Sequence, residues 1–328
     1  MPAPPVGSPL LWIAFGVFVL LMLALDLGVF HRDSHEVSSR EALIWTGVWV
    51  GLALLFNAGI LHWFGHQRGL EFLTGYVIEY SLSVDNIFVF LLIFKYFSVP
   101  AGYQHRVLFW GVLGALVMRL AFILLGAALL NRFEWVMYLF GAALILGGAK
   151  MLKEEEMEVH PERNLILRIF QKFVRTTSQD AGGSLFLRRA GRFYATPLLL
   201  VLVVVEATDL VFATDSIPAI FGVTRDPFVA FTSNIFAIMG LRSLYFLLAS
   251  VLNRFHYLKW GLGLVLIFVG LKMLLEHYVK ISIGASLAVV AVLLSASIAL
   301  SFARPAKLAP PPKEKPPSIP PWSRKHRE

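Results

Sequence analysis

The sequence predicts an all-α polytopic membrane protein. Of its 328 residues, 57% are hydrophobic and only 15% are charged, which is typical of chains that cross a bilayer several times. Apolar runs of about 18 residues or more, enough to span roughly 30 Å of hydrocarbon, recur along the chain. An internal repeat in its middle is the third observation, because inverted repeats build many secondary transporters.

Nine apolar runs are expected to form transmembrane helices. The first run lacks a basic leader and is too long for the core of a signal peptide, so we count it as a span. The predicted spans are 9–30, 41–62, 71–95, 106–130, 134–152, 196–220, 228–252, 257–276 and 281–303. Two peripheral spans therefore occupy residues 1–70, and the ninth span occupies 280–303.

Lys and Arg are unevenly distributed between the connections. Most of them lie after the first, third, fifth and seventh spans and in the tail 304–328. Because cytoplasmic loops retain positive charge, we expect the N-terminus outside, the C-terminus inside and a bacterial inner (cytoplasmic) membrane location. The net charge of +8 then attracts anionic lipid head groups, and nucleic acid is not an expected partner.

The stretch from Glu79 to Leu152 resembles the stretch from Asp209 to Leu274. The first begins EYSLSVDN and ends GGAKML, and the second begins DLVFATDS and ends VGLKML. The two copies, 71–152 and 196–279, contain three spans each, so the orientation above makes them antiparallel. An inverted repeat of three helices is therefore predicted, with its site near the midplane at the repeat interface.

The long connection 153–195 is expected on the cytoplasmic side. It contains a stretch whose apolar residues share one helical face, as in an interfacial amphipathic helix. Those residues are Leu165, Ile166, Ile169, Phe170 and Phe173. The tail 304–328 is basic and rich in Pro, so it is expected to be disordered.

Acidic residues inside the spans carry the functional signal. Glu79 with Asp85, and Asp209 with Asp215, form two pairs of equal spacing, and Glu206 is a fifth acid. Each carboxylate at the bilayer centre costs at least about 2.5 kcal/mol, so such residues usually mark an ion or substrate path. Glu206 is a candidate for an additional acidic or proton site.

The spacing of each pair poses a geometric problem. Residues six apart on a straight helix lie about 240° from each other, so the two acids of a pair do not share a face. We therefore expect a helix break near Asp85 or Asp215, with Pro218 as its cause in span six, or convergence of two helices. Asn86 and Ser216 share a face with Glu79 and Asp209 respectively and are further candidate ligands.

Charge and ligand chemistry indicate a hard cation. The five acids exceed the two intramembrane arginines, Arg119 and Arg242, by three charges, which favours a cation over an anion. The alternative is that these arginines pair with acids and lock the helices together. Cysteine is absent and the histidines lie outside the span interiors, so oxygen donors suit Mn²⁺, Ca²⁺ or Mg²⁺.

These motifs resemble the TerC family of integral membrane proteins in the LysE superfamily. The resemblance rests on ALDLGVFHR (24–32), EYSLSVDNIFVF (79–90), HPERN (160–164) and the run 195–248, which contains VVVEATDLVFATDSIPAIFG. It implies Mn²⁺ export, and the family name implies tellurium resistance. Its acidic positions correspond to the two pairs, with Asn86, Asn234 and Arg242 as polar positions. Asn234 either supplies an amide oxygen from a third helix or caps that helix.

Three functions follow. The first is a secondary transporter that exports a divalent cation in exchange for protons, since no nucleotide-binding motif is found. The second is a membrane partner or assembly factor that supports metal loading or insertion of other proteins, with a protein partner docked at 153–195. The third is tellurite oxyanion transport, which the negative midplane disfavours. We expect no enzyme activity and no prosthetic group, because no catalytic motif is present.

Overall fold

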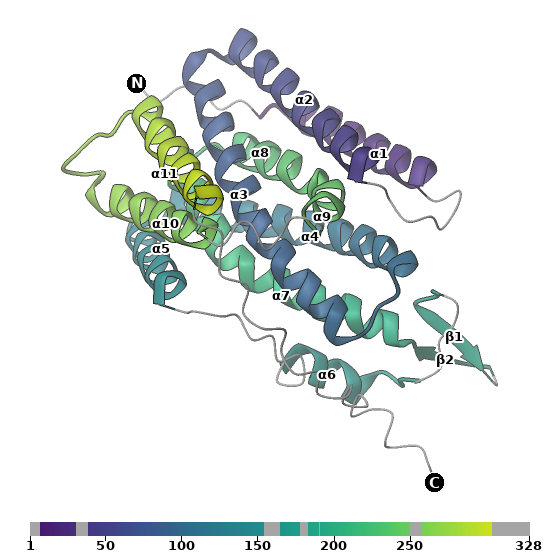
Figure 1. Ribbon diagram of the computed structural model, residues 1–328. Coiled ribbons are helices and arrows are strands. Elements are labelled where there is room, and N and C mark those ends of the chain that lie inside the picture. Colours follow the sequence, from purple (N-terminus) through teal and green to yellow (C-terminus); the bar gives the residue numbers. More distant parts are fainter. Residues whose placement is uncertain are drawn as a thin grey trace.

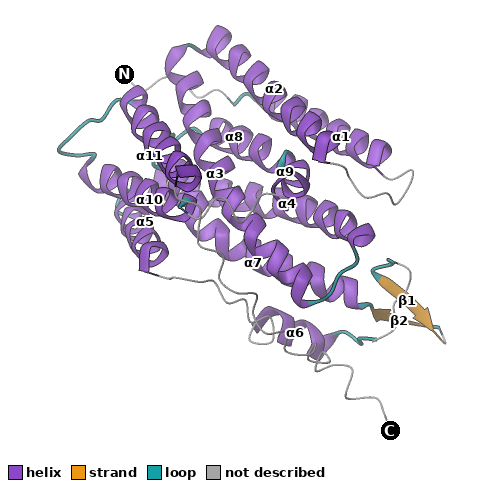
Figure 2. Ribbon diagram, in the orientation of Figure 1, coloured by secondary structure: helices purple, strands orange, loops and turns teal. Residues whose placement is uncertain are grey.

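Long apolar helices make up most of the chain (Figures 1 and 2). The computed structural model describes residues 7–30, 39–153, 165–177, 183–189, 191–249 and 257–303. The helices are α1 (Pro9–Phe30), α2 (Ser39–Phe64), α3 (His66–Tyr96), α4 (Ala101–Arg132), α5 (Val136–Lys153), α6 (Leu165–Phe173), α7 (Pro197–Phe221), α8 (Pro227–Met239), α9 (Leu241–Ala249), α10 (Leu258–Leu275) and α11 (Ile283–Ala303). Strands β1 (Phe186–Arg189) and β2 (Arg192–Ala195) pair as an antiparallel hairpin.

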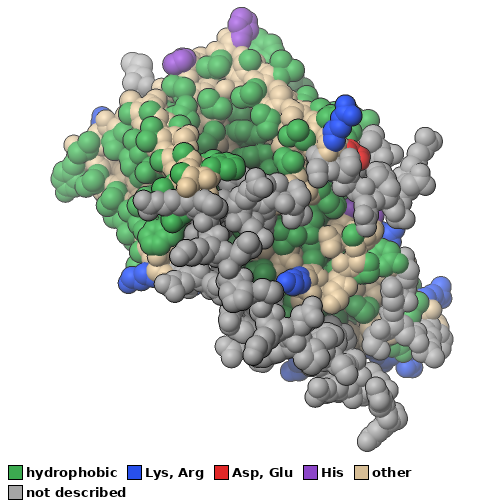
Figure 3. Space-filling model, viewed as in Figure 1, with side chains coloured by type: hydrophobic (Ala, Val, Ile, Leu, Met, Phe, Trp, Pro, Cys, Tyr) green, Lys and Arg blue, Asp and Glu red, His purple; other side chains and the backbone are tan. Residues whose placement is uncertain are grey.

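The predicted all-α polytopic fold is confirmed. Among the described residues, eight helical segments are long and apolar enough to cross a membrane, with α8 and α9 counted together as Pro227–Leu248. α1 adds an apolar helix in the first predicted span. Large hydrophobic side chains are exposed along these helices, and Figure 3 shows a face dominated by them. A lipid environment accounts for such a surface, because lipid tails solvate apolar side chains.

The predicted break near Asp85 or Asp215 is wrong. α3 runs without interruption through position 85, and α7 continues past Asp215 to Phe221. Pro218 lies in the last turn of α7, and the helix continues past it to Phe221, with Gly222 N donating to the Pro218 carbonyl at 3.0 Å. The interruption falls instead at Gly240, between α8 and α9.

α3 lies at the centre of the bundle and contacts α2, α7, α8, α9 and α11 (Figure 1). α8 packs between α3 and α4 and every one of its residues from Phe228 to Met239 is buried. Its aromatic residues Phe228 and Phe236 join Phe15 of α1 and Phe72 of α3 in one apolar core. This enclosure holds the polar residues of α8 away from lipid.

Glycines allow α5 and α10 to approach closely. A Cβ on Gly141 would lie 3.0 Å from the carbonyl oxygen of Gly270, and a Cβ on Gly263 would lie 3.0 Å from that of Gly148. Gly141 and Gly263 occupy matching positions of the two predicted repeat copies, as do Gly148 and Gly270, so the two contacts are reciprocal. They concern one helix of each copy, and the inverted repeat as a whole stays a prediction.

The connection between α5 and α7 contains a strand pair that the sequence analysis did not predict. β1 and β2 are four residues each, and Gly191 between them has a φ of +76°, a backbone conformation that favours glycine. The predicted amphipathic stretch corresponds to α6, whose Leu167 is buried while Ile166 and Ile169 are exposed. The tail 304–328 and residues 154–164 lie outside the described residues.

The close α5–α10 crossing yields a stability prediction. A Cβ on Gly148 would lie 2.5 Å from the carbonyl oxygen of Gly263 and 3.1 Å from Ile267 N. Gly148→Ala should therefore lower the free energy of unfolding by about 1–3 kcal/mol through overpacking. Thermal unfolding of the purified protein in detergent measures the effect.

The matched control is Gly51→Ala on α2, where nothing lies within 4 Å of the added Cβ. This substitution should be neutral or should stabilise by up to about 1 kcal/mol through helix propensity. Equal effects of the two substitutions would contradict the proposed close contact.

Candidate functional site

Five residues from four helices meet inside the bundle, and we call them the central cluster. Arg119 of α4 is 1% exposed and donates from Nη1 to Glu79 Oε1 of α3, to Asn234 Oδ1 of α8 at 3.0 Å and to Ser216 Oγ of α7 at 3.3 Å. Its Nη2 lies 3.5 Å from Asp209 Oδ1 of α7. All five side chains are buried.

Straight helices suffice to assemble the central cluster. Asp209 and Ser216 are seven residues apart on α7 and therefore share a face. α3, α4 and α8 each contribute one further residue. Four helices thus bring Glu79 and Asp209 together around Arg119 without a break, whereas Asp209 and Asp215 do not converge.

The polar atoms of the central cluster are incompletely paired. Glu79 and Asp209 carry two negative charges against one guanidinium, in surroundings that exclude lipid and solvent. Within the described part of the chain, Asp209 Oδ2, Asn234 Nδ2 and Arg119 Nε are buried and have no hydrogen-bond partner. Buried polar atoms are normally satisfied, so such exceptions need an explanation such as a bound ion or a strained functional site.

Other predicted site residues lie around the cluster. Glu206 is half-buried on α7, and its carboxylate lies against Gly114 of α4. Asp215 is also half-buried but faces α5, where a Cβ on Gly147 would lie 2.9 Å from its Oδ1. The different directions of Asp209 and Asp215 agree with their six-residue spacing on a continuous helix.

Three further predicted residues lie on α3 and α9. Asn86 is buried two turns beyond Glu79 on α3, and Arg242 is buried at the start of α9 just after the break at Gly240. Asp85 lies within α3, and its side chain is outside the described residues. Among the described side chains, no group of three or more His, Asp and Glu residues is arranged to hold a metal ion.

A second polar cluster, missed by the sequence analysis, lies at the end of the bundle opposite the hairpin. Glu71 Oε2 of α3 accepts from Arg68 Nη1 at 2.7 Å and from Thr224 Oγ1 at 2.6 Å, and Arg68 Nη2 lies 3.6 Å from Asp226 Oδ2. Asp226 also caps α8 by accepting from Phe228 N at 2.9 Å. We call these four residues the terminal cluster. The i, i+3 spacing of Arg68 and Glu71 is the sequence signal by which part of it could have been found.

The terminal cluster lines a polar cavity of about 890 Å³. Further charged residues of its wall are Glu134, Arg225, Lys272, Glu276 and Lys280. Glu71 and Glu79 are eight residues apart on α3, so the two clusters lie about 12 Å apart along the helix axis. Between them Gly75 packs against Ile220 and Ser233, since a Cβ on Gly75 would lie 2.9 Å from Ser233 Oγ.

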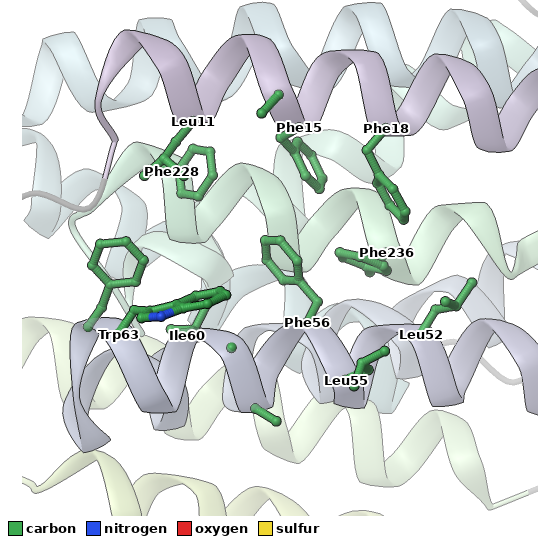
Figure 4. A pocket seen from close by; sticks show the side chains of 14 residues that line it. Leu11, Phe15, Phe18, Leu52, Leu55, Phe56, Ile60, Trp63, Phe228 and Phe236 are labelled. Atoms are coloured by element: carbon green, nitrogen blue, oxygen red, sulfur yellow. The ribbon is translucent and has the colours of Figure 1, made fainter.

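A separate apolar pocket of about 520 Å³ lies between α1, α2 and α8. Figure 4 shows Phe15, Phe56 and Phe236 among the aromatic side chains that line it. Its lining contains no charged residue. The pocket therefore lacks ligands for an ion, and the two polar clusters are the candidate functional region.

The fold and the buried charges define a polytopic α-helical integral membrane protein with a charged cluster in its interior. The chain belongs to the integral membrane protein TerC family, whose family model matches residues 64–307. The predicted family membership is thereby confirmed. All residues of both clusters lie within the matched range.

Curated bacterial relatives cover nearly the whole chain. An uncharacterized membrane protein of Myxococcus xanthus, STKORF319, is 53% identical over 299 residues, covering 91% of this chain and 94% of its own length. The putative membrane-bound redox modulator Alx of Escherichia coli strain K12 is 48% identical over 294 residues, covering 87% and 92%. No solved structure matches the chain.

The central cluster predicts unequal effects of removing its acids. Glu79→Gln removes the charge-assisted hydrogen bond from Arg119 to Glu79 while Asp209 still balances the guanidinium, which should cost about 1.5–3 kcal/mol of unfolding free energy. Asp215→Asn, outside the cluster and half-buried, should cost clearly less. Thermal unfolding in detergent compares the two, and a larger loss for Asp215→Asn would refute the described pairing.

Proposed function

We propose that this protein is a secondary transporter that exports a hard divalent cation, in the first place Mn²⁺, in exchange for protons. The observation that carries the proposal is the convergence of carboxylates from α3 and α7 with an amide and a hydroxyl oxygen inside the bundle. Buried ionisable residues within a membrane protein usually serve an ion or proton path.

The donor set favours a hard cation. Glu79, Asp209, Ser216 and Asn234 offer oxygen atoms only, and the sequence contains no cysteine. Mn²⁺, Mg²⁺ and Ca²⁺ prefer such ligands. The excess of carboxylates disfavours an oxyanion such as tellurite. The relatives' printed name, redox modulator, suggests another role, but this sequence offers no thiol for direct redox chemistry.

The terminal cavity supports a route to one side of the membrane. The cavity reaches the terminal cluster, which lies about 12 Å from Glu79 along α3. Between the cavity and Glu79, the packed residues Gly75, Ile220 and Ser233 block the route. The opposite end of α7 follows the hairpin with Arg188 and Arg192. The proposed orientation puts that basic end in the cytoplasm of a bacterial inner membrane, so exported ions leave through the terminal cavity.

The reciprocal glycine contacts of α5 and α10 support the predicted inverted repeat. In repeat-built transporters, one bundle rocks against the other around a fixed central site. Tight glycine packing joins α5 and α10, one helix from each copy, so each moving body in this proposal contains helices of both copies. The proposed mechanism therefore alternates access to the central cluster between the terminal cavity and the cytoplasmic end.

Exposed apolar residues favour a second candidate function at the connection between α5 and α7. Ile166 and Ile169 of α6 are 40% and 48% exposed, and Phe186 and Phe193 of the hairpin are 56% and 66% exposed. We infer a docking surface for a membrane protein that this chain helps to load with metal or to insert. Serine at these four positions should then abolish the partner's maturation while leaving Mn²⁺ flux intact.

Proteoliposomes test the transport proposal. Purified protein should transport Mn²⁺ in the direction opposite to proton flow down an imposed pH gradient. Collapse of the pH gradient should slow the Mn²⁺ flux. Asp209→Asn should reduce the flux at least about tenfold, because a loss of about 1.4 kcal/mol in ion binding corresponds to that factor.

The matched control for this assay is Glu41→Gln, which removes an acid from the first turn of α2. Flux through this variant should equal that of the wild type. Undiminished flux in Asp209→Asn would refute the site, and absence of Mn²⁺ flux in the wild type would refute the function.

A further inference from the structure

Arg119 holds the position in the central cluster that a cation would take. We infer that its guanidinium is a built-in competitor, which a divalent ion must displace in order to bind Glu79 and Asp209. The inference rests on the proposed function and adds a specific role for this arginine. Four oxygen-bearing side chains from three helices surround the guanidinium.

The geometry differs from that of an optimised structural ion pair. Nη1 carries two hydrogens, yet it faces three oxygens, those of Glu79, Ser216 and Asn234. Meanwhile Nε of the same guanidinium and Oδ2 of Asp209 have no hydrogen-bond partner among the described residues. Several oxygens crowded around one atom suit a spherical cation with six or more ligands better than a planar fork.

Charge balance favours the exchange. Two carboxylates and one guanidinium leave a net charge of −1 in the central cluster, whereas two carboxylates and a divalent ion are neutral. Arginine keeps its proton in proteins, so the positive charge of Arg119 cannot be removed by deprotonation. Its side chain must therefore move when the ion enters.

Glu206 offers a place for the displaced guanidinium. It lies one turn before Asp209 on α7, and its carboxylate touches Gly114, five residues before Arg119 on α4. Five residues turn an α-helix by about 140°, so the Arg119 side chain, which tilts toward the N-terminus of α4, must also swing around that helix to reach Glu206. Glu206 takes part in none of the salt bridges that the described residues form with Arg119.

Competition predicts a measurable penalty on ion affinity. When a site is competent in only a fraction of molecules, the apparent dissociation constant rises by the inverse of that fraction. Removing the guanidinium should remove the penalty. If the coupling free energy between the guanidinium and the ion has the usual size, Arg119→Gln should bind Mn²⁺ about 5–150-fold more tightly than the wild type. Transport by this variant should slow, because the guanidinium no longer displaces the bound ion.

Calorimetric titration of the full-length protein in lipid nanodiscs with MnCl₂ tests the inference. The charge-matched control is Arg188→Gln, which removes an exposed cation from β1 and should leave the dissociation constant unchanged. Arg119→Lys covers the case in which Arg119→Gln fails to fold. Its single ammonium keeps the charge but cannot bridge Glu79 and Asp209 as a fork does, so it should shift the affinity in the same direction by less.

Chemical rescue separates competition from a structural role. In Arg119→Ala, millimolar guanidinium chloride should weaken Mn²⁺ binding, and sodium chloride of equal ionic strength should not. If the wild type binds Mn²⁺ and the folded Arg119 variants bind it no more tightly, the competitor role is overturned and the transport proposal stands. If neither the wild type nor any variant binds Mn²⁺, both proposals fail.

Discussion

A buried arginine shared by carboxylates from two helices is the constraint on which the interior of this protein depends. Arg119 requires Glu79 and Asp209 as counter-charges, since an isolated charge inside a bilayer costs several kcal/mol. That requirement ties α4 to α3 and α7, and Asn234 adds α8. One charged group thus links four helices.

The remaining packing supplies a dry and rigid frame for that group. α8 is buried from Phe228 to Met239, its first turn is capped by Asp226, and its aromatic residues pack against α1 and α3. On the other side of the bundle, α5 and α10 touch backbone to backbone at glycines. The frame explains how polar side chains persist in the interior although lipid surrounds the outside.

The two polar clusters share a design, in which an arginine bridges a glutamate of α3 and an aspartate near or on α7. The terminal cluster faces a charged cavity, whereas the central cluster is enclosed. A packed layer around Gly75 lies between them. In the proposed transport cycle, the cavity is the open vestibule, the layer around Gly75 is the closed barrier and the central cluster is the ion site. The guanidinium of Arg119 occupies that site until the transported cation displaces it.

The sequence by itself determined the helical membrane fold, the positions of the spans and the family, because hydrocarbon demands long apolar helices whose pattern is local. It also pointed to Glu79, Asp209, Ser216 and Arg119 as polar residues in those helices. Only the tertiary structure decided that Arg119 joins them while Asp215 faces α5, and that the chain breaks at Gly240. Contacts between helices depend on rotation and packing, which no local pattern along one helix specifies.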